Sequence, residues 1–275
     1  MKKHVELAVG RRLVDARRVG GGCINEGWQV ELEGGEPAFV KTRAQVAPGE
    51  YGTEARALGW LAEPQAVNVP RVLGVSERLL ALEWIDEGSL STGGAEELGR
   101  GLAQLHAAGS HEFGAPWPLY VGRLKLSNEP LPDWPSFYAE RRLRPLIEEA
   151  SLDRGAAQAV ERVCDRLPEL AGPPEPPARL HGDLWGGNVL GDSKGAGWLI
   201  DPIAYGGHRE VDLAMLRLFG APSGRIFDAY EEAAPLADGH EERVGLWQLF
   251  PLLVHAALFG GHYASQVEQT ARRYI

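Results

Sequence analysis

The sequence predicts an α+β protein with two lobes: a small β-rich N-terminal lobe that contains one helix, and a larger, mostly helical C-terminal lobe. Two observations support this fold class. Short apolar or alternating segments dominate the chain up to about residue 85, whereas apolar residues at helical spacing dominate it afterwards. A polar connector, residues 86–89, separates the two patterns. We therefore expect one lobe over residues 1–85, another over residues 86–275, and a hinge near residues 84–90.

The expected N-terminal lobe holds a small sheet. Four segments have the alternation or apolar content of strands, at residues 28–33, 38–41, 70–75 and 79–85. Gly34-Gly35 is a turn signal between the first two. The single helix is expected at residues 49–62, with Glu54 beside its apolar face. Gly20, Gly21 and Gly22 come just before the first expected strand and indicate a glycine loop at the end of the hairpin.

The expected C-terminal lobe is built from helices. Apolar spacing predicts a helix through Leu98, Leu102 and Leu105 that ends near His106, and further helices from residue 134 and over 153–167, 207–220 and 243–260. Pro145 and Pro251 are expected to kink or interrupt two of them. Residues 172–177 are a proline-rich loop. Residues 189–190 and 198–200 are expected to form a hairpin.

Composition excludes several classes of protein. The chain of 275 residues is 44% hydrophobic and carries a formal net charge of −10, so it lacks the basic excess of a nucleic-acid binder. No apolar run is long enough to span a bilayer, and no apolar signal core follows the basic start. We expect a cytoplasmic protein with no nucleic-acid or membrane partner. Two cysteines are too few for a disulfide framework or a cysteine zinc site.

Three polar residues suggest phosphoryl transfer. Asp183 follows His181-Gly182 in a glycine-flanked loop, where a carboxylate can take the proton of an attacking hydroxyl. Asn188 and Asp201 offer the oxygen ligands that Mg²⁺ prefers. Each of these residues alone also fits an ordinary loop or turn. The three in this order favour a catalytic site that uses Mg²⁺ and a nucleotide.

Upstream residues fit a nucleotide. Lys41 ends an apolar strand, so it either pairs with Glu54 and faces phosphates or extends into solvent. Gly20, Gly21 and Gly22 form either a phosphate-covering loop or a merely flexible one; no Walker or dinucleotide motif follows them. The backbone of Glu83 and Ile85, at the end of a strand, can bind adenine, although any strand edge offers such groups.

Three further residues have two interpretations each. Trp185 is either a core residue or a platform for an apolar or cationic part of the substrate. Asp212 either accepts hydrogen bonds from the catalytic loop or is a first-turn acid stabilised by the helix dipole. Cys23 is either inert or an exposed thiol that oxidises or cross-links. Cys164 is expected in a helix core.

Several segments resemble the fructosamine kinases. They are residues 20–24 (Gly-Gly-Gly-Cys-Ile), 39–41 (Phe-Val-Lys), 181–188 (His-Gly-Asp-Leu-Trp-Gly-Gly-Asn), 201–210 (Asp-Pro-Ile-Ala-Tyr-Gly-Gly-His-Arg-Glu) and 252–263. The similarity runs from about residue 19 to the end. It implies a protein-kinase-like fold of the aminoglycoside and choline phosphotransferase branch. Asp-Phe-Gly and Ala-Pro-Glu, typical of protein kinases, are absent from the sequence.

The resemblance implies an ATP- and Mg²⁺-dependent kinase for the 3-hydroxyl of ketosamines, which are small molecules or glycated protein lysines. The phosphorylated adduct is unstable and releases the amine. Bacterial-type members tend to prefer ribulosamines and erythrulosamines over fructosamines. Asp183 would be the base, Asn188 and Asp201 the metal ligands, Lys41 and Glu54 the ATP-positioning pair, and Trp185 a substrate contact.

Family members also carry a glycine-loop cysteine linked to redox-sensitive dimerisation, so the resemblance implies a monomer or a homodimer linked through Cys23. Ile203, where the family usually has Ala, and Gly186-Gly187, where Ser-Gly is common, are small departures. Two alternatives remain. One is a small-molecule kinase for an aminoglycoside or an amino alcohol such as choline, and the other is a degenerate kinase fold that only binds partners.

Overall fold

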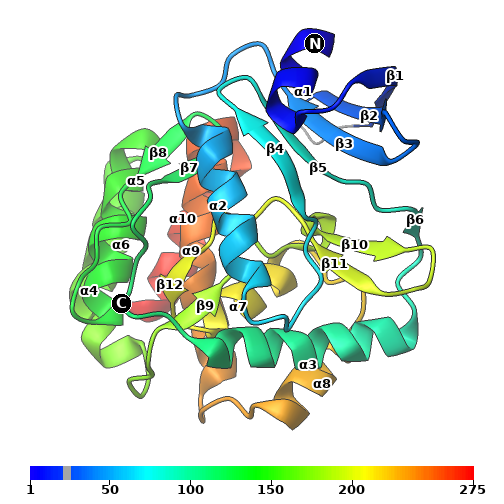
Figure 1. Ribbon diagram of the computed structural model, residues 1–275. Helices are drawn as coiled ribbons and strands as arrows, with labels where there is room; N and C mark the ends of the chain where they lie inside the picture. The colour runs from blue at the N-terminus through cyan, green and yellow to red at the C-terminus, as the bar shows by residue number, and fades with distance from the viewer. Residues whose placement is uncertain (21–25) are drawn as a thin grey trace.

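An antiparallel sheet occupies the N-terminal part of the computed structural model, which describes residues 1–20 and 26–275 (Figure 1). Its strands lie in the order β1-β2-β3-β5-β4. Their bounds are Leu13–Val19 (β1), Glu26–Leu32 (β2), Pro37–Thr42 (β3), Val72–Ser76 (β4) and Leu79–Glu83 (β5). Gly34 and Gly35 both have positive φ, at 100° and 81°, which explains why glycine stands at the β2–β3 turn. The four expected strands are therefore confirmed.

Two N-terminal elements were not expected. Helix α1 (Lys2–Val9) gives this part of the chain a second helix, and β1 precedes Gly20, so the glycine segment follows the first strand instead of preceding it. Both elements carry little sequence signal because they bury little. In β1 only Leu13 is buried, and in α1 only Val5. Gly21, Gly22 and Cys23 lie outside the described residues.

The two faces of the sheet pack against different helices. On one face, Val5 of α1 joins Leu32, Val40 and Ala81 in a small apolar cluster. On the other, Leu58 of α2 (Glu50–Ala62) packs with β5 in a cluster that continues into α3 (Thr92–Ala108), α7 (Glu210–Leu218) and α8 (Arg225–Ala233). Figure 1 shows α2 running from the sheet toward α3. Helix α2 is thereby held by both parts of the molecule.

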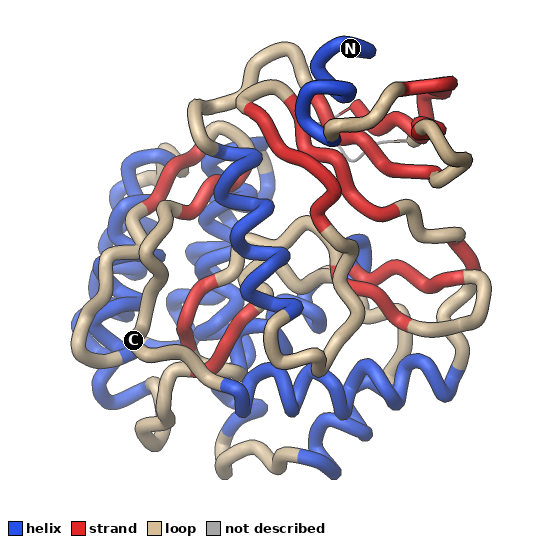
Figure 2. Tube along the Cα trace, in the orientation of Figure 1, coloured by secondary structure: helices blue, strands red, loops and turns tan. Residues whose placement is uncertain are grey.

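The C-terminal part is mainly helical, as expected (Figure 2). A third apolar cluster joins the segment 134–149 to α6 (Arg154–Leu170), α9 (His240–Phe259) and α10 (His262–Ala271). The segment 134–149 consists of α4 (Trp134–Phe137), a π-helical turn (Tyr138–Leu143) and α5 (Arg144–Glu149), so the interruption expected at Pro145 is present. None of the helices that the structure describes is long and apolar enough to cross a membrane.

Short strands hold the loops of the C-terminal part. β9 (Ala178–Leu180) pairs with β12 (Tyr205–Gly207), and β10 (Val189–Asp192) pairs with β11 (Gly197–Leu199) and with β6 (Glu87–Gly88). The β10–β11 pair is the expected hairpin. A further hairpin, β7 (Leu119–Val121) with β8 (Leu124–Leu126), lies between α3 and α4. These pairings leave residues 181–188 and 200–204 as adjacent loops, because each is bounded by paired strands.

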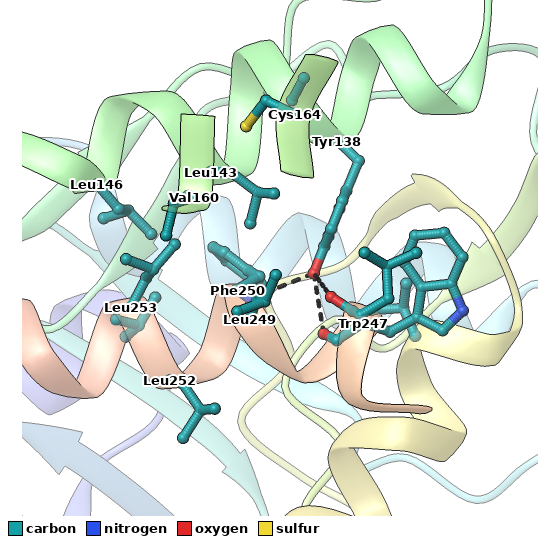
Figure 3. Packing of buried hydrophobic residues seen from close by; sticks show 14 of the residues in the cluster. Tyr138, Leu143, Leu146, Val160, Cys164, Trp247, Leu249, Phe250, Leu252 and Leu253 are labelled. Atoms are coloured by element: carbon teal, nitrogen blue, oxygen red, sulfur yellow. Dashed lines mark hydrogen bonds between the residues drawn. The ribbon is translucent and has the colours of Figure 1, made fainter. Parts of the chain in front are cut away.

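The expected interruption at Pro251 is wrong, because α9 continues through this residue. Proline has no N–H to donate to the carbonyl of Trp247, four residues earlier. The buried hydroxyl of Tyr138 takes the place of that donor: it lies 3.0 Å from the carbonyl oxygens of both Leu246 and Trp247, and it accepts the N–H of Phe250 at 3.2 Å (Figure 3). A side chain from the π-helical turn thus completes the helix.

Replacing Tyr138 with Phe is therefore expected to cost about 1–3 kcal/mol, because a buried carbonyl and a buried N–H lose their partner. Pro251→Ala supplies the missing N–H, so the double variant should be less destabilised than the sum of the two single variants. Urea unfolding of the four proteins measures this coupling, and additive effects would contradict it. Tyr274→Phe is the control, since its hydroxyl also bonds a helical carbonyl, of Glu242 at 2.7 Å, but at an exposed site.

Candidate active site

Asp212 organises the loop that follows β9. This fully buried carboxylate, in the first turn of α7, accepts the backbone N–H groups of His181 at 2.7 Å and Gly182 at 2.9 Å. His106 of α3 lies 3.3 Å from the same carboxylate. Burial alone would raise the pKa of Asp212, but the contacts with His106, His181 and the Gly182 N–H lower it below its usual value. Asp212 therefore holds residues 181–182, just before Asp183, as an anion.

The loops on either side of the β10–β11 hairpin are tied together. The ring Nε2 of His181 lies 2.9 Å from the carbonyl oxygen of Ile200, and the N–H of Ile200 donates to the carbonyl of Asn188 at 3.1 Å. Asp201 comes next and has a positive φ of 55°, which turns the chain sharply after β11. Asn188 and Asp201, remote in sequence, consequently line one cavity.

Lys41 is an ion-paired residue of this cavity. Its side chain is 7% exposed, and its Nζ lies 2.9 and 3.1 Å from the two carboxylate oxygens of Glu54 and 3.0 Å from Oδ1 of Asp201. Burial would lower the pKa of Lys41, but the charges of Glu54 and Asp201 raise it above its usual value. The interpretation of Lys41 as a solvent-directed lysine is therefore wrong. Three elements, β3, α2 and the loop after β11, converge on one ammonium group.

Asp183 is the carboxylate best suited to accept a proton. The side-chain amide of Asn188 donates to its backbone carbonyl at 2.8 Å and to its Oδ2 at 3.1 Å. Burial is the main cause that raises the pKa of Asp183 to about 7, and the hydrogen bond from Asn188 opposes this increase. A general base works best when its pKa lies near the pH of the reaction. This environment therefore suits proton abstraction near neutral pH.

The same loops offer oxygen atoms to a divalent cation. The Asn188 amide donates its N–H groups to Asp183, which leaves the Oδ1 atom of Asn188 as an acceptor. In Asp201 only Oδ1 accepts a hydrogen bond from Lys41. Within the described residues, no three His, Cys, Asp or Glu side chains form a metal-holding group. This set fits Mg²⁺, which commonly takes one or two protein oxygens and completes its shell with waters and phosphates.

A cavity of about 410 Å³ joins these residues to the sheet. Lys41, Asp183, Asn188 and Asp201 line it. Residues 83–85, at the end of β5 and in the expected hinge, line it as well, together with the apolar side chains of Phe39, Leu82, Leu190 and Ile200. Gly20 also lines it, whereas the rest of the expected glycine loop lies outside the described residues. Apolar side chains together with a buried cation and carboxylates are the lining that the base and the phosphates of a nucleotide require.

Trp185 is a surface residue at the rim of this cavity and not a core tryptophan. It is 38% exposed, and its ring covers Gly187 so closely that a Cβ atom there would lie 2.2 Å from it. Its edge meets Phe219 with a centroid distance of 6.3 Å, and Phe219 in turn contacts His255 at 4.7 Å. Phe219 and His255 were not among the expected site residues. His255 lies in the 252–263 segment, whose similarity to the fructosamine kinases was the available signal.

Comparisons with known proteins agree with this geometry. The family model described as fructosamine kinase matches residues 2–275. A solved structure described as a fructosamine-3-kinase, from Thermobifida fusca, superposes with a TM-score of 0.94 at 44% identity and covers 100% of this chain and 98% of its own. The chloroplastic protein-ribulosamine 3-kinase of Arabidopsis thaliana is 32% identical over 268 residues, 94% of this chain and 81% of that protein.

More distant structures share the architecture. The choline kinase LicA from Streptococcus pneumoniae has a TM-score of 0.66 at 14% identity, with 98% of this chain and 95% of that chain covered. This likeness shows the fold alone, and it agrees with the branch that the sequence resemblance implies. The chain therefore belongs to the fructosamine kinase family, and it is a phosphotransferase with the protein-kinase-like fold.

Proposed function

We propose that this chain transfers the γ-phosphate of ATP, with Mg²⁺, to the 3-hydroxyl of ketosamines, with ribulosamines and erythrulosamines preferred over fructosamines, and thereby starts deglycation. The acceptors are free ketosamines or glycated protein lysines. The observation that carries the proposal is Asp183, a carboxylate with a pKa raised to about 7, in the same cavity as Lys41, which is paired with Glu54. A base for an alcohol and a cation for phosphates in one cavity are what a small-molecule kinase requires.

Each residue has a role in this proposal. Asp183 accepts the proton of the sugar hydroxyl, and Asp212 holds the loop that carries Asp183. Lys41, oriented by Glu54, contacts the phosphates. Residues 1–85 form the lobe that positions the nucleotide, with Gly20, Gly21 and Gly22 over the phosphates and the backbone of Glu83 and Ile85 at adenine; residues 86–275 carry the catalytic and metal loops. Mg²⁺, when bound by Asn188 and Asp201, neutralises phosphate charge.

Trp185 is proposed to hold the acceptor. It borders the cavity near Asp183, and its ring forms one exposed aromatic surface with Phe219. A ketosamine presents a sugar-derived chain and a secondary amine that is positively charged at neutral pH. An aromatic ring face stabilises such a cation by about 0.5–2 kcal/mol. The exposed indole therefore suits this acceptor better than it suits an anionic one.

The competing proposal is a kinase for an aminoglycoside or for choline, which shares the fold and the catalytic residues. A panel with ribulosyl-lysine, fructosyl-lysine, kanamycin and choline separates the two by ATP consumption. We expect the largest kcat/KM with ribulosyl-lysine. Trp185→Ala should lower that value about 10-fold or more while leaving the affinity for ATP unchanged. Turnover of kanamycin or choline, but of neither ketosamine, would overturn the proposal.

The redox-linked homodimer remains a proposal that rests on the sequence, since Cys23 lies outside the described residues. The other cysteine, Cys164, is buried in α6, and burial raises the pKa of its thiol to about 12. Burial and a raised pKa disfavour the thiolate that disulfide exchange needs. Any cross-link between two copies of this chain is therefore assigned to Cys23.

A further inference from the structure

Trp117 contacts two separate parts of the active site. It lies in the segment between α3 and α4, just before β7. Its indole N–H donates to the carbonyl of Ala204 at 3.1 Å, three residues after Asp201. Its ring meets the ring of Trp60 edge to face, with centroids 5.8 Å apart and planes at 77°. Trp60 lies on α2, the helix that carries Glu54.

Trp117 is itself held from the helical core. Its carbonyl accepts the side-chain N–H of Asn128 at 2.9 Å, and Asn128 accepts a hydrogen bond from Arg142 of the π-helical turn. Arg142 is fully buried and takes part in none of the ion pairs formed by the described residues. Its guanidinium packs on the rings of Phe137 at 4.6 Å and Tyr205 at 4.0 Å. Because Tyr205 follows Ala204, this network returns to the segment that Trp117 contacts.

Besides its apolar packing, α2 and the residues just before it contact the C-terminal part through Tyr120 and Arg179. The hydroxyl of Tyr120, in β7, donates to the carbonyl of Pro48 at 3.0 Å, just before α2 begins. Arg179 of β9 packs on the ring of Trp60 at 4.4 Å and donates to its backbone carbonyl. Near its C-terminal end, α2 therefore contacts Trp117, which bonds the segment after Asp201, and Arg179, which lies just before the loop of residues 181–188.

Trp117 lies close to the ion pairs of Lys41. A second cavity, of about 160 Å³, is lined by Trp117 together with Lys41, Glu54, Asp183 and Asp201. Glu54 and Asp201 must approach the same ammonium group from different elements, α2 and the loop after β11. Trp117 contacts both elements, through its indole N–H to Ala204 and through its ring against Trp60.

We infer that Trp117 is a positioning residue, which sets α2 and the 201–204 segment at the separation where Glu54 and Asp201 both reach Lys41. The inference rests on the proposed roles of Lys41 and Asp201 in binding the nucleotide and Mg²⁺. Its structural alternative is that Trp117 only fills space. If Trp117 only fills space, its replacement should lower stability and nothing else. If Trp117 positions the two elements, its replacement should also reduce the enhancement of nucleotide affinity by Mg²⁺.

Trp117→Phe tests the inference, with Trp134→Phe as a matched control. Phe retains a ring that can meet Trp60 but lacks the N–H for Ala204. Trp134 is 4% exposed, and its indole N–H has no hydrogen-bond partner among the described residues, so its replacement removes packing alone. Calorimetry measures the affinity for a non-hydrolysable ATP analogue with and without Mg²⁺. Thermal unfolding of the metal-free proteins reports the stability of both variants.

For Trp117→Phe we expect the enhancement of nucleotide affinity by Mg²⁺ to fall about 10-fold and kcat to fall with it, at a Tm no lower than that of Trp134→Phe. For Trp134→Phe the enhancement should equal that of the wild type. Equal enhancement in all three proteins would overturn the inference. If the wild type shows no enhancement by Mg²⁺, the proposed function itself fails. Should Trp117→Phe not fold, Trp60→Leu replaces it, because it removes the ring that Trp117 meets on α2. We then expect an about two- to threefold loss of enhancement, and an unchanged enhancement would overturn the inference.

Discussion

Asp183→Asn is expected to lower kcat by about 10²- to 10⁴-fold, the contribution typical of a general base. Asparagine preserves the shape of the side chain and can still contact Asn188, but it cannot take a proton. The KM for ATP should stay within about twofold, because Lys41 and the backbone of residues 83–85 remain. Single-turnover phosphate transfer to the preferred ketosamine measures the effect. A kcat near that of the wild type would remove Asp183 from the proposed mechanism.

The same substitution should stabilise the protein in the absence of metal. The folded-state pKa of Asp183 is raised to about 7 from 3.8, so the folded protein binds this proton more tightly than the unfolded chain. The carboxylate therefore destabilises the fold increasingly as the pH rises from about 4 to 7, and fully above that range. We expect Asp183→Asn to gain about 1–3 kcal/mol at pH 8 and almost nothing below pH 4. Urea unfolding at both pH values tests this, and a gain confined to low pH would contradict the assigned pKa.

Lys41→Met should abolish activity and also destabilise the fold by about 3–5 kcal/mol, the usual cost of leaving one partner of a buried ion pair unpaired. Glu54 is only 13% exposed, and burial already raises its pKa above the usual value even with Lys41 present. Without the ammonium group, Glu54 must either stay charged in an apolar setting or bind a proton. Chemical unfolding at pH 8 measures the loss of stability.

The double variant Lys41→Met/Glu54→Gln separates stability from catalysis. Glutamine has no charge to leave unpaired, so the double variant should recover much of the lost stability while its activity stays absent. Arg123→Met is the control for removing a cation from an ion pair, because Arg123 and Glu149 are 60% and 49% exposed and such pairs contribute less than about 1 kcal/mol. If the double variant were as unstable as Lys41→Met, burial of Glu54 would not be the cause.

Local sequence patterns predicted most elements of this fold because those elements bury one face. The alternation at residues 28–33, the apolar segment 79–85 and the helical spacing at 49–62 each reflect packing against a core. β1 and α1 were missed for the opposite reason, since each buries a single residue. A one-dimensional pattern records burial, and an edge element that buries little leaves no pattern.

Contacts between remote residues explain the other differences. The order of Lys41, Glu54, Asp183, Asn188 and Asp201 identified the candidate site, but spacing alone did not show that Asp201 would pair with Lys41. Trp117, Phe219 and His255 belong to no short motif that the chemistry alone singles out. Their positions depend on how the segment 109–133 and the C-terminal helices pack against α2 and the loops, which is a property of the tertiary structure.

The hydrogen bonds that the hydroxyl of Tyr138 forms with the backbone of α9 have a consequence for the order of folding. A helix with proline at its centre cannot complete its backbone hydrogen bonds by itself. In the segment 240–259 the missing bond forms only after Tyr138, more than a hundred residues earlier, has packed beside the helix. Loop closure over that separation is slow compared with the growth of an ordinary helix. The helix that supports His255 should therefore become complete late, once the rest of the helical core has assembled.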